Sequence, residues 1–482
     1  MKGFRNLTAF HSARRWGFFL ALILCLLAVP AQAWADPGSI ITKIRSSQSA
    51  ERVRIVFEFN NIPQYKVTTL ENPLRLVLNL SGSVNQAGLS QITFNDPIVS
   101  KLRLFAAGAG KLQAVVDLKS TYMYNVFTIK NPDRLIVDII KNYDQKLVEE
   151  VTPGIKHISW QRSTGDGPVW AHALDVDPQA GYLIKPVLSN GIVQGLETLV
   201  PMSQRARAIA AVNGSYFAPD GTIIGLLKMD GQIVSTPELP RTAFGILPDG
   251  KIIIDQVDYE GKVELPDGRT IPLSAVNRER GPDELILYNS FYDATTRSNP
   301  YGIEVTIING KIAAINDNNS PIPPDGAVLS AHGAAAKIMS GLKIGDEVKI
   351  SQTLGTVWDK ITWALSAGPM LVKDNSVFLT TKIEEFGPDV AGGRAPRTAL
   401  GITADGHILL VVVDGRQSTS IGMTLLETAL FMQELGATDA MNLDGGGSSE
   451  MVIRDTVVNK PSDGQERKLG SAVVVIPGRI AN

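Results

Sequence analysis

Short runs of alternating apolar and polar residues dominate the N-terminal part of the chain. The run VRIVFEF, residues 53–59, is typical, and Asn, Pro and Gly separate it from the next runs. Alternation with a period of two residues is the pattern of strands that bury one face. Residues 40–140 show no helical period. We therefore predict an all-β domain over residues 38–142.

This domain also repeats itself. The segment YKVTTLENPLRLVLNL, residues 65–80, aligns with YNVFTIKNPDRLIVDI, residues 124–139. Each copy consists of an extended run, an Asn-Pro turn and a second apolar run. Two copies of one β unit favour two small sheets packed as a sandwich.

The pattern changes after residues 143–154, a charged segment that ends in Pro-Gly and that we interpret as a linker. Helical periodicity now appears among strands, in residues 201–208, in residues 330–341 behind a cap at Ser330, and in residues 424–436. Asp-Gly and Asn-Gly pairs between apolar runs predict type I′ hairpins, at residues 230–231, 249–250, 309–310 and 405–406. Residues 155–482 are therefore predicted to form a larger, mixed α+β domain.

The larger domain contains an internal duplication. RTAFGILPDG, residues 241–250, is nearly repeated as RTALGITADG, residues 397–406, and each copy follows a predicted hairpin. Two related halves that face each other form a natural binding cleft. We expect Arg241 and Arg397 to lie at the same end of each half. In the alternative interpretation, both arginines only end surface loops.

The first 35 residues have the pattern of a secretory signal peptide. Four basic residues precede an uncharged run, residues 18–29, and small residues follow at cleavage spacing. An uncleaved anchor is the alternative, but the run is short for a membrane span. Lipoprotein processing at Cys25, the single cysteine, would need a small residue before it, where the chain has Leu24. We predict a secreted, periplasmic or wall-associated protein with no membrane span after signal removal.

The net charge of −2 points away from nucleic acid, which basic surfaces bind. The most specific polar stretch is instead NLDGGGSS, residues 442–449. Consecutive glycines can turn several amides toward one anion. A plain tight turn is the alternative, but a plain turn does not require this many polar neighbours. The candidate residues here are Asn442, Asp444, Gly445, Gly446, Gly447 and Ser448.

Two further loops follow apolar strands. VVVDGR delivers Asp414 and Arg416 to a strand end, where sites are often built, although an Asp-Gly turn beside an exposed arginine is the simpler interpretation. VNGSYF delivers Asn213 and Tyr216, and this tyrosine can either stack on a sugar or fill a core edge. Glu427 has the spacing of a capping box with Thr424.

Together, the motifs NGSYF, RTALGI, VVVDGRQ, GMTLLETA and LGATDAMNLDGGGSS make residues 155–482 resemble the phosphodiester glycosidase family. The N-terminal domain resembles the AMIN module of bacterial envelope proteins, which implies binding to peptidoglycan or another cell-wall polymer. Ser215 departs from the glycine expected in the family's loop.

The glycosidase resemblance implies cleavage between a sugar's anomeric carbon and the oxygen of a phosphodiester. Such a leaving group needs its charge held more than it needs strong protonation. Of Asp414 and Asp444, one would stabilise an oxocarbenium-like centre on the sugar, and the other would activate water or attack directly. Arg241, Arg397 and Arg416, with the amides of Gly445–Gly447, would hold the phosphate.

Two other functions stay open. A metal-dependent phosphodiesterase would use Asp414, Asp444 and Asn442 as oxygen ligands for calcium or magnesium, although the residues demand no cofactor. A protein without enzymatic activity would bind the wall through both domains.

Overall fold

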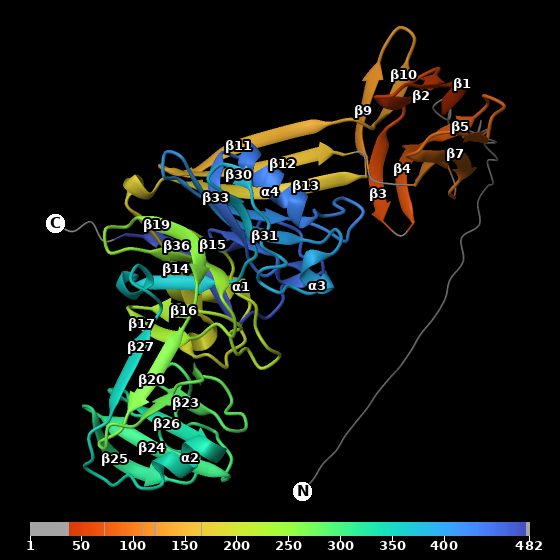
Figure 1. Ribbon diagram of the computed structural model, residues 1–482. Helices are drawn as coiled ribbons and strands as arrows, with labels where there is room; N and C mark the ends of the chain where they lie inside the picture. Colours follow the sequence, from red (N-terminus) through yellow and green to blue (C-terminus); the bar gives the residue numbers. More distant parts are fainter. Residues whose placement is uncertain (1–37, 72, 109, 120–121, 165, 479–482) are drawn as a thin grey trace, which may run out of the picture.

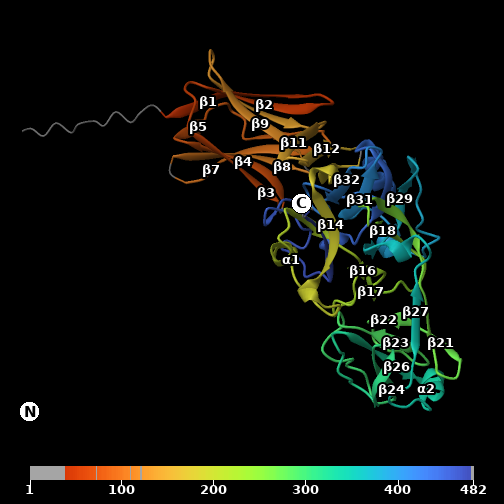
Figure 2. The same cartoon turned by 90° about the vertical axis from the view of Figure 1, so that its left-hand side faces the viewer.

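The computed structural model describes residues 38–478, except residues 72, 109, 120–121 and 165. Strands account for 50% of the residues and helices for 9%, so the protein is mostly β, with less helix than an α+β domain suggests. Figures 1 and 2 show an elongated molecule, with the N-terminal domain and a second small domain at opposite ends of a central one. The predicted signal peptide lies outside the described residues. Among the described residues, no helix is long and apolar enough to cross a membrane.

The N-terminal domain consists of two five-stranded sheets, with the orders β5-β1-β2-β10-β9 and β3-β4-β8-β7-β6. Alternate side chains of both sheets, such as Val53, Ile55 and Phe57, share one core. The repeated segments form equivalent hairpins, β3–β4 in one sheet and β9–β10 in the other. The strands are β1 (Ser39–Gln48), β2 (Arg52–Phe59), β3 (Tyr65–Glu71), β4 (Leu74–Ser81), β5 (Ser83–Asn85), β6 (Gln91–Thr93), β7 (Val99–Ala106), β8 (Lys111–Leu118), β9 (Met123–Ile129) and β10 (Arg134–Ile140).

The central domain contains three related units, not two. Their strand orders are β17-β16-β28-β18-β19, β30-β29-β33-β31-β32 and β35-β34-β15-β36-β14. Every neighbouring pair in these five-strand arrays is antiparallel. The strands are β14 (Tyr182–Leu188), β15 (Ala210–Asn213), β16 (Leu227–Met229), β17 (Gln232–Ser235), β18 (Arg241–Ile246), β19 (Ile252–Val257), β28 (Trp363–Ser366), β29 (Met370–Lys373), β30 (Ser376–Val377), β31 (Arg397–Thr403), β32 (Ile408–Val413), β33 (Ala437–Asn442), β34 (Met451–Ile453), β35 (Thr456–Val457) and β36 (Ser471–Pro477).

The third unit explains what the repeated motif does. RTAFGI is β18 and RTALGI is β31, and the strand in the equivalent place is β36, which follows Gly470 and begins Ser-Ala-Val. The matching side chains Phe244, Leu400 and Val473 are fully buried in one shared core. The repeat therefore builds a common centre. The third copy is hard to recognise in the sequence because it keeps the apolar pattern and lacks the arginine.

The middle strands β15, β28 and β33 each lead into the hairpin of the next unit. The loops that follow these three strands carry the NGSYF, SAGP and LDGGGSS motifs. The connections that precede the three strands differ. One contains helix α1 (Leu199–Ala206), another contains helix α4 (Leu425–Glu434), and the third contains the inserted domain.

The inserted domain lies between β19 and β28 and has a core of its own. Helix α2 begins at Gly333 and not behind a Ser330 cap, because Ser330 lies within β26 and donates to the buried Glu304 carboxylate at 2.7 Å. Its elements are β20 (Glu260–Glu264), β21 (Thr270–Pro272), β22 (Ala275–Val276), β23 (Leu285–Tyr288), β24 (Gly302–Ile308), β25 (Lys311–Asn316), β26 (Gly326–His332), α2 (Gly333–Met339) and β27 (Lys349–Thr353).

The segment expected to be a linker is instead mostly strand. β11 (Asp144–Thr152) pairs with β12 (Ile155–Ser163), which continues through β13 (Pro168–Val176) into the sheet of the second unit. β11 is an edge strand, and even its apolar residues Leu147 and Val148 are 57% and 51% exposed. Its composition resembles a linker because neither face is buried.

Local signals elsewhere agree with the structure. Helix α4 begins with the predicted capping box between Thr424 and Glu427. The Asp-Gly and Asn-Gly pairs all close hairpins. Both residues have positive φ, as type I′ requires, at Asp230–Gly231 and Asn309–Gly310. The predicted type I′ turn is wrong at the other two pairs, where only the glycine has positive φ.

Candidate active site

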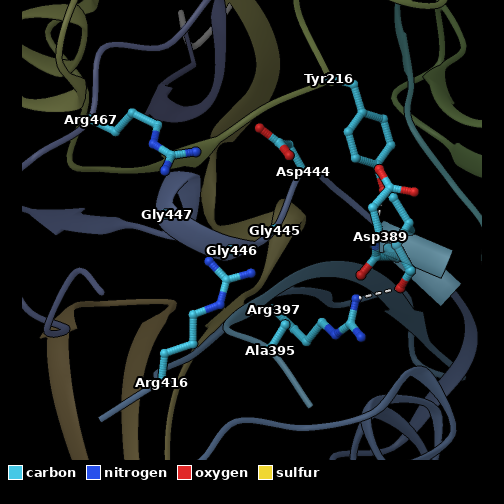
Figure 3. Close-up of a pocket in the computed structure, with 12 residues that line it drawn as sticks. Tyr216, Asp389, Ala395, Arg397, Arg416, Asp444, Gly445, Gly446, Gly447 and Arg467 are labelled. Atoms are coloured by element: carbon cyan, nitrogen blue, oxygen red, sulfur yellow. Dashed lines mark hydrogen bonds between the residues drawn. The ribbon is translucent and has the colours of Figure 1, made fainter. Parts of the chain in front are cut away.

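A cavity of about 200 Å³ lies where loops of the second and third units meet. Tyr216 comes from the loop after β15, Asn442 from the end of β33 and Arg416 from the loop after β32. Figure 3 shows the side chains that surround it. The lining residues are Tyr216, Asp389, Val390, Ala395, Arg397, Arg416, Asn442, Asp444, Gly445, Gly446, Gly447 and Arg467.

Two arginines pack against the glycine loop. Gly446 has a φ of +64°, and a Cβ built there would lie 3.3 Å from Arg416 Nη1. A Cβ on Gly447 would overlap the Arg467 guanidinium. Arg416 itself has a φ of +58°, a backbone conformation that costs a non-glycine residue about 1–3 kcal/mol. The loop needs glycines because guanidinium groups occupy the space of side chains.

The loop amides are less available than the sequence suggests. The Gly445 amide donates to the Asp444 carboxylate, and the Gly446 amide donates to Pro396 O at 2.9 Å. Ser448 also donates its hydroxyl to Asp444 and not toward a ligand. The positive charge of the cavity therefore comes from guanidinium groups more than from the predicted nest of amides.

Asp444 is a half-buried carboxyl at this loop. Burial raises its pKa to about 6, although the Ser448 hydroxyl, the Gly445 amide and nearby Arg467 all lower it. Burial dominates because a charge in a low-dielectric site loses its hydration. Asp444 therefore holds a proton up to a higher pH than an ordinary aspartate does.

Asp414, the other predicted catalytic carboxylate, is not among the residues that line the cavity. Its Oδ1 accepts from Asn459 Nδ2 and from the Lys460 amide, both at 3.0 Å. Burial raises the pKa of Asp414 to about 6. These contacts tie the end of β32 to residues 459–460, and the catalytic role that we expected of Asp414 stays a prediction. Asp414 thus lies outside the lining that Asp444 and Asn442 share, and within the described part of the chain no group of three or more His, Cys, Asp or Glu could hold a metal ion.

The two repeated arginines have different surroundings. Arg397 lines the cavity, but its three nitrogens donate to the carbonyls of Met423, Val390 and Gly393, each at 3.0 Å. Burial lowers its pKa from the usual value. These bonds hold the loop that contains α3 (Pro388–Ala391) over the cavity, as the dashed contact in Figure 3 illustrates.

Arg241 does not line the cavity. Its guanidinium lies 4.2 Å from the centre of the Phe386 ring, and Phe386 in turn packs on Tyr216. The two arginines therefore do not face one anion from opposite walls, because the repeated strands belong to a three-unit arrangement that places their ends in different surroundings.

The polar residues after the middle strands bond to one another. Tyr216 donates its hydroxyl to Gly368 O at 3.0 Å, and Asn442 Nδ2 donates to the Tyr216 hydroxyl, also at 3.0 Å. This triangle joins the three units at the cavity floor. Asn213 lies behind it, where its Nδ2 donates to Asp444 O at 2.7 Å. Ser215 donates to Ser366 O, so the departure from glycine adds a tie between two units.

Two cavity residues, Asp389 and Arg467, were not found from the sequence. Asp389 lies on the loop that Arg397 holds, and its carboxylate reaches the cavity as a second acidic group. Arg467 lies four residues before β36, the unrecognised third copy of the repeated strand. Recognition of that copy would have drawn attention to Arg467.

An acidic pair lies beside the same loop. Glu450 is fully buried, and neither of its oxygens has a hydrogen-bond donor. Burial first, and then the neighbouring Glu466 carboxyl, raise the pKa of Glu450 to about 9. Glu450 therefore keeps its own proton at neutral pH, and its neighbour Glu466 is followed directly by Arg467 of the cavity.

Fold and cavity together define a protein in which an N-terminal β sandwich precedes a central domain, and the cavity of this central domain is lined by arginines and aspartates. Residues 41–139 match the family profile of the AMIN domain, and residues 302–476 match that of the phosphodiester glycosidases. The chain thus carries an AMIN domain and a phosphodiester glycosidase domain, which confirms both resemblances. The second match begins inside the inserted domain.

Individual relatives cover less of the chain. The mouse N-acetylglucosamine-1-phosphodiester alpha-N-acetylglucosaminidase is 30% identical over 105 residues, which is 21% of this chain and 20% of that protein. The SPbeta prophage-derived uncharacterized protein YomE of Bacillus subtilis is 38% identical over 81 residues, 17% of this chain and 12% of that protein. The chain thus spans about a fifth or less of these curated relatives.

Two solved structures share the fold over most of the chain. A hypothetical protein from Synechocystis has a TM-score of 0.65 at 20% identity, over 91% of this chain and 81% of that one. A putative exported protein from Burkholderia pseudomallei has a TM-score of 0.58 at 23% identity, over 93% of this chain and 100% of that one.

Proposed function

We propose that this protein hydrolyses glycosyl-1-phosphodiesters, cleaving between the sugar and the phosphate. The substrates would be bacterial cell-wall glycans or related polymers, and the AMIN domain would hold the enzyme at the wall, in the periplasm or outside the cell. The observation that carries the proposal is the cavity itself, where Arg416, Arg467 and Asp444 gather at a glycine loop and where Asp389 supplies a second acidic group to the lining. The match to the phosphodiester glycosidases and the names of its mammalian relatives support this substrate class.

Arg416 and Arg467 are the proposed phosphate ligands. Both line the cavity at the glycine loop, and guanidinium groups bind phosphate oxygens through paired, charge-assisted hydrogen bonds. Arg467 donates from Nε and Nη2 to Asp463, at 2.8 and 2.6 Å, whereas all three nitrogens of Arg397 donate to carbonyl oxygens, so Arg397 is the weaker candidate. As the sugar–oxygen bond breaks, charge grows on the departing phosphate, and fixed cations stabilise it.

Asp444 and Asp389, the two carboxyls that line the cavity, have different proposed roles, one at the leaving oxygen and one at the anomeric carbon. The proton that Asp444 retains up to a pH of about 6 lets it donate to the leaving oxygen without repelling the phosphate. Asp389 then acts at the anomeric carbon, where a carboxylate activates water or attacks directly. Asp389 takes the place we expected Asp414 to fill, since Asp414 does not line the cavity.

Product analysis tests this function. Purified protein without residues 1–35 is incubated with defined sugar-1-phosphodiesters, with and without a chelator. Free reducing sugar and a phosphomonoester are expected in both samples. Sugar phosphate would instead indicate a phosphodiesterase, and no product from any substrate would favour a binding protein.

Wall targeting has its own test. Purified sacculi are expected to retain the full protein. A variant that lacks residues 38–142 is expected to remain in solution, with its turnover of a small soluble substrate unchanged.

A further inference from the structure

The orientation of the Asn442 side-chain amide is fixed by its surroundings. Its Nδ2 donates to the Tyr216 hydroxyl, to Gly368 O at 3.2 Å and to Leu443 O at 2.5 Å. A flipped amide would point its oxygen at two carbonyl oxygens, which repel it. The nitrogen therefore faces the triangle between the units, and Oδ1 must point elsewhere.

Oδ1 of Asn442 is buried and has no hydrogen-bond donor among the described residues. The side chain is 1% exposed and belongs to the cavity wall. Nearly all buried polar groups in folded proteins have a hydrogen-bond partner, because an unpaired buried acceptor loses its hydrogen bonds to water and gains none in the protein. An acceptor left unpaired at a binding cavity is the arrangement expected when the ligand supplies the donor.

The other polar groups of the cavity do not duplicate this contact. Arg416 and Arg467 can only donate, and they suit phosphate oxygens. Asp444 already accepts from Gly445 and Ser448. Asn442 thus provides a neutral acceptor, which suits an uncharged O–H or N–H group on the sugar.

We propose that Asn442 selects the sugar by accepting a hydrogen bond, through Oδ1, from one ring hydroxyl or amide N–H of the substrate. This inference deepens the proposed function and rests on it for the identity of the ligand. A site built around such a bond rejects the analogue that lacks the donor far more strongly than an apolar pocket rejects a missing methylene, often by a factor of about 100 or more. Asn442 is then a specificity-determining residue.

Binding of non-hydrolysable substrates tests this inference without requiring turnover. The probes are methylphosphonate esters linked through carbon to glucose or N-acetylglucosamine, each lacking a single hydroxyl or carrying an N-methylated amide. Dissociation constants are measured by calorimetry for the wild-type protein and for Asn442→Ala. One analogue is expected to bind the wild type at least about 100-fold more weakly than its parent, and Asn442→Ala should reduce that ratio to less than about threefold.

Tyr216→Phe is the matched control. It removes one partner of Nδ2 and leaves Oδ1 in place, so affinities should fall for all probes alike while the ratio between parent and analogue persists. Thermal unfolding shows whether each variant is folded. If Asn442→Ala does not fold, Asn442→Ser replaces it in the measurement. Equal discrimination in wild type and variant, or equal wild-type affinity for every analogue, would overturn the inference. If the protein hydrolyses no sugar phosphodiester but Asn442→Ala still reduces the affinity ratio between parent and analogue, only the proposed function would be overturned.

Discussion

The guanidinium of Arg467 fills the space that a side chain on Gly447 would occupy. Gly447→Ala should therefore displace Arg467 and lower kcat/KM by about 100-fold or more, since a small misplacement of a positioning group has that effect. Gly341→Ala is the control, because a Cβ there meets nothing within 4 Å. Steady-state kinetics on a sugar-1-phosphodiester measure both variants, and equal rates would show that Arg467 is not needed in this position.

Removal of either proposed phosphate ligand should weaken substrate binding. Arg416→Ala and Arg467→Ala are each expected to raise KM by about 10- to 100-fold, since a hydrogen bond to a charged group contributes about 1.5–3 kcal/mol. Arg269→Ala, a change to an exposed arginine of the inserted domain that pairs with Asp267, is the control. A normal KM in both cavity variants would rule out their role as phosphate ligands.

Arg397 should act through the loop that it holds. Arg397→Ala removes three hydrogen bonds to carbonyl oxygens, so we expect a lower melting temperature and a fall in kcat as Asp389 loses its position. Arg397→Lys can restore one of these bonds and should recover only part of the kcat. A change in KM alone, with kcat and melting temperature intact, would instead assign Arg397 to the phosphate.

Activity should depend on the proton of Asp444. Because its pKa is raised to about 6, the protonated acid persists below that pH and is lost above it, so kcat is expected to fall as pH rises beyond about 6. Asp444→Asn should lower kcat by at least about 100-fold, within the range of general acid catalysis, and should abolish this dependence. Asp414→Asn is the matched control. The Asp414 carboxyl has a similarly raised pKa but does not line the cavity, so the pH profile of that variant should keep its shape.

The Glu450–Glu466 pair should make stability depend on pH. The folded protein holds a proton on Glu450 up to a pH of about 9, whereas the unfolded chain releases it near the usual glutamate pKa of 4.5. The folded state thus binds more protons between these values, and the free energy of unfolding falls as pH rises, by at most about 1.4 kcal/mol per unit.

Glu450→Gln tests this linkage. The glutamine amide has no proton to release in this range, so the melting temperature of the variant should vary less between pH 5 and pH 9 than that of the wild type. Glu264→Gln, on the exposed face of β20, is the control. A parallel dependence of the melting temperature on pH in wild type and Glu450→Gln would show that Glu450 does not retain its proton in the folded state up to that pH.

Local pattern predicted the local structure well. Alternation along residues 53–59 predicted a buried strand face, and the Thr424–Glu427 spacing predicted the start of α4. Both signals depend on interactions within a few residues. The sequence did not predict β11, because an edge strand that buries neither face shows no alternation of apolar and polar residues.

The candidate site could be predicted only in part. Asp444, Arg416 and the glycines follow apolar strands, and the structure places them in the cavity. Asp414 follows a strand in the same way, but its carboxylate turns to Asn459, a partner 45 residues away that no local pattern reveals. Asp389 reaches the cavity because Arg397 holds its loop there, and this contact also exists only in the folded chain.

The most direct test of the account is hydrolysis of a glycosyl-1-phosphodiester in water enriched in oxygen-18. If Asp444 and Asp389 catalyse attack of water at the anomeric carbon, the label enters the free sugar and the phosphomonoester stays unlabelled. Label in the phosphate, with sugar phosphate as a product, would mean attack at phosphorus and would contradict the account.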